Sequence, residues 1–592
     1  MRTESSGPRF RQLARSVGLV LFLTVTLSAC SGSEERLWLK APGWNRAQLI
    51  GNTGSGDPTP IALDDQGRIY LFLIHIENDL AYPHVIALDR EMETVWDYTY
   101  DVESSQASRP QILWDGSGLH LFWLGDQGLY HVALDTAGAM TAKPTLLLRE
   151  GPLDSYDAAA APDGAVTVWF AGPRRQPGLY AAPLSDLGGK AVLVDAEGVR
   201  PSLQFDDAGA LYATWAHYPP GYGENRLYYG TYPEGQYQPG LENLVHSPRL
   251  GMATFLLGPW LGLDDEQSYI IWAEQSRTGM EAGKVAALYI NFPSGRPTLT
   301  SPPRQLIIPP SYNLPYSDYP EGSLNAGKRV LLEPRGSSHI TDIDPLSSQN
   351  QELAVTFRAR IDYLQRKERD QVSILYFQDG APTTYQLLSF SSADSQDPAI
   401  ISDEDGNLYL TWLERGDLTG FTVYFATTAS DLQSTIKSLT WQDVGQLSAE
   451  TLFGLATGAL LLPIVLIWLI VPILVIVLTS FLRSDDESLT NPGTLLSLSL
   501  SGIAYWVGKL LVLPGMRDYV PFSAWLPFIP PWSFVPLKIG VPLLIAALAL
   551  YTAWILTYRR DRPSALYLLL LYAVIDGVLT TAVYGVIFFA AF

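Results

Sequence analysis

Charged side chains stand just before several segments whose apolar residues alternate as in β-strands. They are Arg109, Asp157, Arg200 and Asp397. Two carboxyl groups about 5 to 10 Å apart can together cleave a glycosidic bond. Guanidinium groups bind carboxylates through paired hydrogen bonds. If the strands converge, these residues predict a polar pocket suited to a ligand such as a sugar.

A second set of polar residues ends the strands that follow. It comprises His75, His217, Glu274 and Glu414. Antiparallel neighbours begin and end at the same edge of a sheet, so we expect both sets on one side of the fold. The catalytic candidates are Asp157, Glu274, Asp397 and Glu414, and the ligand-binding candidates are Arg109, Arg200, His75 and His217. The alternative is that all of them cap strands and line a solvated channel.

The strands belong to a repeat: a strand, an acidic turn, and a second strand that mostly ends in tryptophan. Copies begin at residues 60, 110, 158, 201, 261 and 398, and a divergent copy begins at Glu352. Segments such as IYLFL, LYATW and LYLTW alternate as β-strands, and Asp and Gly supply the turn. The spacing of the early copies leaves room for four short strands, the size of a propeller blade.

The copies predict an all-β propeller of about seven blades over residues 36–446. Six or eight blades stay open, because residues 301–338 are rich in Pro, Tyr and Ser and are interpreted as an irregular insert. The segment RLWLK from Arg36 is expected to join the last blade, since closing the ring removes exposed sheet edges. A pair of β-sandwiches is the competing fold.

The acidic turns resemble the Asp-box of sialidase-like bacterial propellers, which reads Ser/Thr-x-Asp-x-Gly-x-x-Trp. The nearest matches are Asp65-x-Gly67-x-x-Tyr70, Asp207-x-Gly209-x-x-Tyr212 and Ser402-x-Glu404-x-Gly406-x-x-Tyr409. The first two lack the Ser/Thr, the third has Glu in place of Asp, and the turn joins the first two strands instead of the third and fourth. The resemblance therefore implies a propeller and not sialidase activity.

The tryptophans of the repeat are Trp123, Trp169, Trp215, Trp272 and Trp412. Their shared place in the blade favours packing between blades over stacking on a carbohydrate.

The N-terminus has the form of an export signal. A positive segment that includes Arg9 and Arg15 precedes the apolar residues 17–27, and the sequence Leu-Ser-Ala-Cys ends at Cys30. This resembles the bacterial lipobox, which implies cleavage before Cys30, lipidation of its thiol, and a short tether over residues 31–35. An uncleaved signal anchor is the alternative, and both interpretations export the domain that follows.

The C-terminal residues 451–592 predict a bundle of four membrane-spanning helices. The expected spans are 451–482, 494–513, 534–558 and 564–592, each with about 20 or more mostly apolar residues. Basic residues gather after the first and third spans, at Arg483 and at 559–562, which predicts that these loops are cytoplasmic. The propeller then lies outside a bacterial cell membrane, as the export signal also requires.

Two charged residues stand within these spans, Lys509 in the second and Asp576 in the fourth. An intramembrane charge is expensive and needs a partner. Counted from the cytoplasmic ends the two residues lie at similar depth, so we expect them to face each other. The pair is either structural, with Lys509 alternatively reaching toward the headgroups, or part of a proton or ion pathway.

Composition excludes several classes of function. The chain has 60 acidic and 39 basic side chains and a net charge of -21, which argues against a nucleic-acid partner. One cysteine permits no intramolecular disulfide, and no Cys/His cluster has zinc spacing. No nucleotide, hydrolase or metalloprotease motif stands in a supporting context, so neither cofactor nor metal is expected.

Together these features favour a membrane-anchored recognition or scaffold protein whose propeller binds a glycan, a peptide or an envelope protein. The bundle could also pair with other membrane subunits. One alternative is a glycoside hydrolase of sialidase-like fold that acts on envelope or environmental sugars. Another is the sensor subunit of a membrane transport or signalling complex. Propellers host many functions, so the fold alone does not choose among these.

Overall fold

The computed structural model describes residues 41–585 with gaps. Outside it lie residues 1–40, 42, 147–152, 173–177, 188–190, 219–224, 252, 280–281, 309–329, 332–338, 347–351, 365–366, 390, 392, 416–419, 436–451, 453–454, 457, 459, 483–490, 514–515, 518, 523–530, 560–563 and 586–592. The predicted signal, lipobox, Cys30 and tether all fall outside the described residues.

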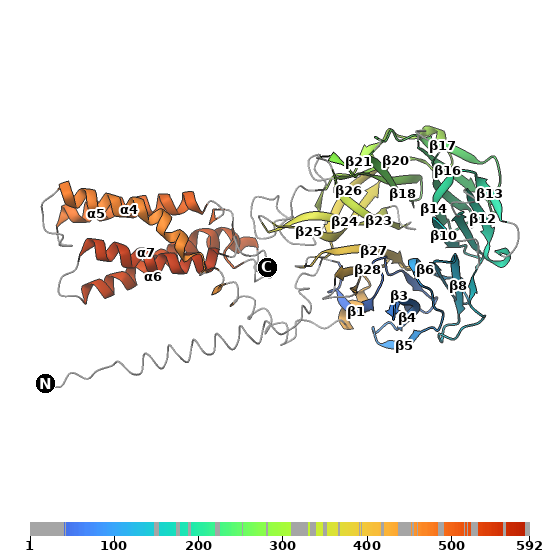
Figure 1. The fold of residues 1–592 in the computed structure, drawn as a ribbon, viewed down its shortest axis with the longest axis horizontal. Helices are drawn as coiled ribbons and strands as arrows, with labels where there is room; N and C mark the ends of the chain where they lie inside the picture. The colour runs from blue at the N-terminus through green and yellow to red at the C-terminus, as the bar shows by residue number, and fades with distance from the viewer. Residues whose placement is uncertain are drawn as a thin grey trace.

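The propeller prediction is confirmed: seven antiparallel sheets form a ring of blades (Figure 1). Blade 1 contains β2 (Ile61–Leu63), β3 (Ile69–Glu77), β4 (Leu80–Leu88) and β5 (Thr94–Thr99). Blade 2 contains β6 (Ser108–Trp114), β7 (Leu119–Leu124), β8 (Leu129–Leu134) and β9 (Thr145–Leu146). Blade 3 contains β10 (Ser155–Ala160), β11 (Val166–Ala171), β12 (Leu179–Pro183) and β13 (Val192–Asp195), with a short 3-10 turn at Leu184–Asp186.

The remaining blades repeat this order with local changes. Blade 4 contains β14 (Gly198–Phe205), β15 (Leu211–His217), β16 (Arg226–Tyr232) and β17 (Glu242–His246). Blade 5 contains β18 (Thr254–Leu263), β19 (Gln267–Ser276), β20 (Val285–Pro293) and β21 (Arg304–Gln305), with a 3-10 turn at Pro297–Leu299. Blade 6 contains β23 (Ile340–Leu346), β24 (Leu353–Leu364), β25 (Lys367–Gln378), β26 (Ala381–Leu387) and β22 (Val330–Leu331). Blade 7 contains β27 (Ser395–Ser402), β28 (Leu408–Arg415), β29 (Phe421–Thr427) and β1 (Gln48–Thr53).

The N-terminal strand closes the ring, as expected, but from a later segment than the sequence suggested. β1 pairs antiparallel with β29 as the outermost strand of blade 7. Just before it, the Asn45 amide donates to the Thr427 carbonyl at 2.8 Å, and Thr427 N donates to Asn45 Oδ1 at 2.7 Å. The expected segment from Arg36 lies outside the described residues.

Residues 301–338, interpreted from sequence as an irregular insert, contribute strands at both ends. Arg304–Gln305 forms the outer strand of blade 5 and Val330–Leu331 the fifth strand of blade 6. Residues 309–329 are not described. Blade 6 also carries the two longest strands of the ring, β24 and β25, each of 12 residues.

The disc has two faces. We call the face where the innermost strands begin the upper face, and the face where their turns to the second strands lie the lower face. On the lower face an aspartate opens the turn, and its carboxylate accepts turn N–H groups and a tyrosine hydroxyl from the second strand. The pairs are Asp64–Tyr70 at 2.9 Å, Asp206–Tyr212 at 3.1 Å, Asp264–Tyr269 at 2.6 Å and Asp403–Tyr409 at 2.9 Å.

These acceptors lie one residue before the positions matched to the Asp-box motif. Asp64 and Asp206 accept the bonds instead of Asp65 and Asp207. A carboxylate on the first residue after the strand can reach both the turn amides and the next strand, whereas the side chain that follows it is exposed. The motif was therefore matched out of register.

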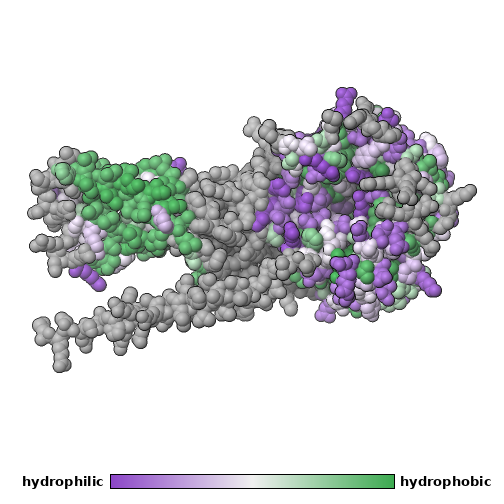
Figure 2. Space-filling model, viewed as in Figure 1, coloured by the Kyte–Doolittle hydropathy of each residue, from purple (hydrophilic) through white to green (hydrophobic). Residues whose placement is uncertain are grey.

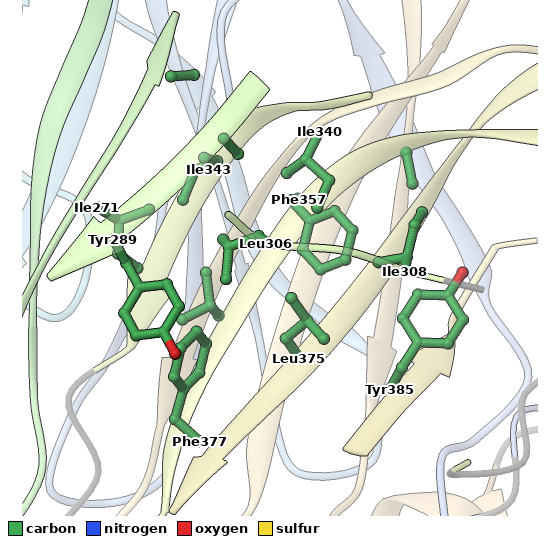
Figure 3. Packing of buried hydrophobic residues seen from close by; sticks show 14 of the residues in the cluster. Ile271, Tyr289, Leu306, Ile308, Ile340, Ile343, Phe357, Leu375, Phe377 and Tyr385 are labelled. Carbon is green, nitrogen blue, oxygen red and sulfur yellow. The ribbon is translucent and has the colours of Figure 1, made fainter. Parts of the chain in front are cut away.

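Apolar side chains fill the space between blades. Between blades 5 and 6, Phe357, Leu375 and Tyr289 pack together with almost no exposed surface (Figure 3). All five repeat tryptophans are buried. Four of them pack toward the preceding blade, but Trp169 lies one residue out of register on the opposite face of its strand and contacts Trp215 at a ring distance of 5.7 Å.

The helical region contains four helices that could cross a membrane by length and composition. They are α4 (Leu462–Leu482), α5 (Pro492–Val512), α6 (Phe534–Tyr558) and α7 (Ala565–Tyr584). α4 packs on α5 and α6 on α7, and α7 also contacts α4 and α5. Figure 2 shows apolar residues gathered over these helices, in contrast to the propeller surface. A short helix, α2 (Ser430–Thr435), follows blade 7, and a 3-10 turn, Pro531–Ser533, precedes α6.

Candidate functional site

Four innermost strands begin on the upper face with the same irregularity. Arg109, Arg200, Asp342 and Asp397 have φ values of 53°, 54°, 49° and 50°. At each, the pairing with the second strand slips. Blade 5 has Gly258 (φ 82°) at the equivalent place. A left-handed backbone is strained for residues with a Cβ, and such strain concentrates at functional sites. Three of the four are sequence candidates, so the repeat itself presents them at one level of the ring.

The densest charge cluster joins blades 6 and 7. Arg358 Nε lies 3.0 Å from Asp342 Oδ2 and 3.9 Å from Asp370 Oδ2. The Asp342 carboxylate also accepts the backbone N–H of Asp397, which places the two acids side by side. Gln396 Oε1 accepts a long bond of 3.5 Å from Arg358 Nη1. One guanidinium thus serves several carboxylates.

This crowding changes how Asp397 ionises. Burial first, then the carboxylates of Asp342 and Asp57, raise the pKa of Asp397 to about 8, although Arg358 opposes them. Burial also raises the pKa of Asp342. Two acids that disfavour each other's charge are poised to share a proton or to accept hydrogen bonds from a ligand.

The cluster extends toward blades 2 and 3. The negative charge of the Asp57 carboxylate helps to raise the pKa of both Asp397 and Tyr156. The buried Tyr156 hydroxyl donates to the Arg109 carbonyl at 2.5 Å and so holds the left-handed turn at Arg109. The Arg109 side chain itself is exposed. We call Asp57, Arg109, Asp342, Arg358 and Asp397 the upper-face cluster.

Asp157 points inward and bonds to its neighbours. Its carboxylate accepts from Gln111 Nε2 of blade 2 and, at 2.6 Å, from Leu203 N of blade 4. Asp344 of blade 6 accepts Ile400 N of blade 7 in the same manner at 2.8 Å. Burial raises the pKa of Asp157 to about 6 and that of Asp344 to about 7. These acids fasten one blade to the next around the axis, so Asp157 has a structural role whatever else it does.

Arg200 is likewise held by the protein. Its Nη1 donates to the Leu256 carbonyl of blade 5 and, at 3.4 Å, to the Tyr218 hydroxyl. Its guanidinium lies 5.9 Å from the centre of the Tyr218 ring. Arg200 is therefore less available to a ligand than Arg109.

The second set of candidates bonds locally at the strand ends. Glu274 Oε1 accepts Trp272 Nε1 at 3.2 Å, and the buried Glu414 accepts Trp412 Nε1 at 3.5 Å and Ser395 Oγ at 3.0 Å. These bonds satisfy indole N–H groups that would otherwise be buried without an acceptor. Burial raises the pKa of Glu414.

The two histidine candidates contact residues that do not belong to the upper-face cluster. His217 lies 2.9 Å from Asp195 and 3.2 Å from Glu197, at the turn before β14. His75 is exposed, and its ring lies 6.5 Å from that of His84. Of the eight candidates, Asp397 lies among the contacts around Arg358, and Arg109 is related to them only indirectly, through Tyr156 and the Asp57 carboxylate; the others make local or blade-to-blade contacts.

Sequence reasoning missed Asp57, Asp342 and Arg358. Asp342 lies in the innermost strand of blade 6, which the divergent copy from Glu352 did not include. The segment ITDIDPL carries an acid at the same place as Asp397 in SQDPAIIS, and this match could have revealed it. Arg358 had no sequence signal, because only the β23–β24 pairing brings it to Asp342.

Within the described residues, no group of three or more His, Cys, Asp or Glu side chains could hold a metal ion. The upper-face cluster contains carboxyl and guanidinium groups, which suit hydrogen bonding to a polar organic ligand.

No protein-family model matches the chain, and no curated protein matches it. Among solved structures it is similar to a polysaccharide lyase, the PL25 ulvan lyase bound to -[GlcA(1-4)Rha3S]-, with 11% identity and a TM-score of 0.44 over 66% of this chain and 100% of that one. It is also similar to Trypanosoma rangeli sialidase in complex with the inhibitor DANA, with 9% identity and a TM-score of 0.33 over 67% of this chain and 61% of that one. Likeness this distant carries no information about a ligand or a reaction.

Proposed function

We propose that this chain is a membrane-anchored recognition protein that binds a polar ligand, of the glycan class, at the upper-face cluster of its propeller. The observation that carries the proposal is the crowding of Asp342 and Asp397 around Arg358 beside a strained backbone. A fold that needed only stability would not keep two partly buried acids next to each other. Acids and guanidinium groups together match the many hydroxyl donors and acceptors of a sugar.

The anchor is the helical region, and we propose that α4 to α7 all cross the membrane. Arg483 and Arg559–Arg562 would then be cytoplasmic, and the propeller extracytoplasmic. A lipid on Cys30 would add a second attachment close to β1. We take residues 36–446 as the propeller and 451–592 as the membrane domain. A lysine-labelling reagent that cannot cross the membrane, or a protease, added to one side of sealed vesicles would test this orientation.

The binding proposal is tested with the full chain in nanodiscs. A ligand that binds the folded state raises the midpoint of thermal unfolding by mass action. We expect an oligosaccharide from a panel of neutral, acidic and amino sugars to raise this midpoint. Asp397→Asn and Arg109→Gln should each weaken the binding at least tenfold, because the first replaces a carboxyl group that hydrogen-bonds to the ligand and the second removes a guanidinium charge.

Asp405→Asn is the matched control. Asp405 is exposed on the lower face and belongs to the same blade as Asp397. It should leave affinity unchanged. If no oligosaccharide shifts the midpoint, or if Asp405→Asn weakens binding as much as Asp397→Asn, the site is not a glycan site at this cluster.

A second function, glycoside cleavage, is favoured by one observation, the raised pKa of Asp397 next to Asp342. A carboxyl group that stays protonated near neutral pH can act as a general acid toward a leaving oxygen. Cleavage of a bound oligosaccharide would then fall as pH rises through about 8, where Asp397 loses its proton. Chromatography of the bound oligosaccharide after long incubation distinguishes the two functions: intact sugar at every pH leaves only binding.

A further inference from the structure

Three polar groups of the helical region gather around one carboxylate oxygen. Asp576 Oδ2 on α7 lies 2.7 Å from Lys509 Nζ on α5 and accepts the Tyr505 hydroxyl at 2.8 Å. Thr580 Oγ1 approaches the same oxygen at 3.4 Å. Lys509 and Asp576 are both fully buried, with 0% of each side chain exposed. The sequence expected these residues to face each other, and the structure brings them into contact.

The other carboxylate oxygen has no such partners. Within the part of the chain that the structure describes, the fully buried Asp576 Oδ1 has no hydrogen-bond partner, and the same holds for Ser501 Oγ and Tyr584 Oη. In a membrane an unsatisfied polar group is costly, because no bulk water can bond to it. A buried polar atom without a protein partner often marks an ordered water molecule.

Two rows of buried polar side chains extend from the Lys509–Asp576 contact, one along α5 and one along α7. Ser501, Tyr505 and Lys509 are four residues apart and occupy one face of α5. Asp576, Thr580 and Tyr584 have the same spacing on α7. At about 1.5 Å per residue each row spans about 12 Å.

The remaining neighbours do not supply another charge. α4 contributes the buried Trp468 and contains no charged residue, and the single charge of α6, Lys538, stands near its start. On α5 and α7 the nearby titratable groups are Lys509, Tyr505 and Tyr572, whose ring lies 5.3 Å from that of Tyr505. Among the residues described in α4 to α7, Lys509 is the cation that compensates Asp576.

We infer that Asp576 is the centre of a hydrated, proton-exchanging site inside the bundle, with water bonded to its Oδ1 and to the hydroxyls above and below it. A proton relayed through this water from the aqueous side adds to Oδ1 and gives a neutral carboxyl group, while the water molecule is restored and Lys509 keeps its ammonium. The ion pair then weakens to a single hydrogen bond, and α5 and α7 are held less tightly. The inference depends on the proposed membrane insertion and goes beyond ligand binding by the propeller.

The test uses the full chain in liposomes and the carboxyl infrared band of Asp576, assigned by its loss in Asp576→Asn. Exchange of the buffer from H₂O to D₂O should shift this band within minutes, because water reaches the carboxyl group. A band that stays unshifted for hours overturns the inference and leaves a dry structural pair. Carbonate extraction of the same liposomes tests the membrane insertion separately.

A second measurement uses dicyclohexylcarbodiimide, which adds to a protonated carboxyl group in an apolar setting and leaves a covalent adduct that mass spectrometry locates. Labelling of Asp576 should rise at least threefold from pH 8 to pH 6. Lys509→Met should raise labelling at pH 8, because it removes the cation that keeps Asp576 ionised. Labelling that is absent at every pH, together with a slow infrared exchange, refutes the site even if Lys509→Met fails to fold.

Discussion

The two faces of the propeller use aspartate in opposite ways. On the lower face Asp403 accepts Asn407 N at 2.8 Å and the Tyr409 hydroxyl at 2.9 Å, and Asp64, Asp206 and Asp264 repeat this arrangement. On the upper face Asp342 and Asp397 lie next to each other, and the pKa of Asp397 is raised to about 8. The first kind of carboxylate is satisfied by neutral donors, and the second competes with other carboxylates for Arg358.

The contrast between the faces indicates which positions of the repeat can hold reactive groups. The lower-face acids recur because blades 1, 4, 5 and 7 use the same turn. The upper-face residues vary from blade to blade: Arg109, Arg200, Gly258, Asp342 and Asp397 occupy equivalent places. A position whose backbone is constant and whose side chain varies can be adapted to a ligand without disturbing the ring.

The largest change in stability is expected from removing a lower-face aspartate whose carboxylate is hydrogen-bonded. Asp403→Ala should lower the free energy of unfolding by about 2 to 4 kcal/mol, because it strands the Tyr409 hydroxyl and frees the turn amides. Denaturant unfolding of the full chain measures the loss. Asp405→Ala, in the same turn but exposed, should stay within about 0.5 kcal/mol of the original chain. Equal losses in the two variants would remove the distinction between the faces.

On the upper face, removing an acid is expected to raise the free energy of unfolding instead of lowering it. The folded-state pKa of Asp397 lies above its ordinary value of 3.8, so its contribution to stability is full below about pH 4 and is lost as pH rises through about 8. Asp397→Asn should therefore stabilise the chain by about 1 to 2 kcal/mol at pH 8 and by little at pH 4, since partial exposure screens the repulsion. Thermal unfolding at both pH values checks this. Destabilisation at pH 8 would place Asp397 among the structural acids.

Blade 2 differs from the Asp–Tyr arrangement of the lower face. Its contribution to the free energy of unfolding should change with pH by about 1 kcal/mol. There His120 replaces the tyrosine: it lies 2.9 Å from Asp115 and 2.9 Å from His131. Burial, and then His120, lower the pKa of His131 from 6.5 to about 4. This stability is present above pH 6.5 and is lost as pH falls toward 4. His131→Gln should flatten that part of the stability profile, and the exposed His75→Gln should not.

The smallest change in stability is expected from replacing Arg109. Its side chain is exposed, and the bond from Tyr156 goes to its backbone carbonyl. Arg109→Gln should change the free energy of unfolding by less than about 0.5 kcal/mol while it weakens ligand binding. A large loss of stability would mean that the guanidinium supports the ring and is not reserved for a ligand.

Much of the architecture could be predicted because it follows from local patterns. Alternation in segments such as LYLTW, with Asp and Gly at the turn, predicted the blades, and seven sheets are present. The span predicted at 534–558 coincides with α6, and those at 494–513 and 564–592 differ from α5 and α7 mainly at their ends. The first, 451–482, begins before α4. Blade 6 was less predictable, because its first strand, ITDIDPL, lacks the acidic turn and the tryptophan.

By itself, the sequence determined the elements whose cause is local: apolar periodicity, turn residues and uninterrupted apolar length. It also indicated that Arg109 and Asp397 belong to one level of the ring, because they precede equivalent strands. Only the tertiary structure decided that Asp397 lies beside Asp342 and Arg358, while Asp157 and Glu414 bond within the scaffold. The physical reason is that the charge state of an acid depends on its burial and on neighbours within a few ångströms. Those neighbours come from other blades and helices, which only the closed ring and the packed bundle bring together.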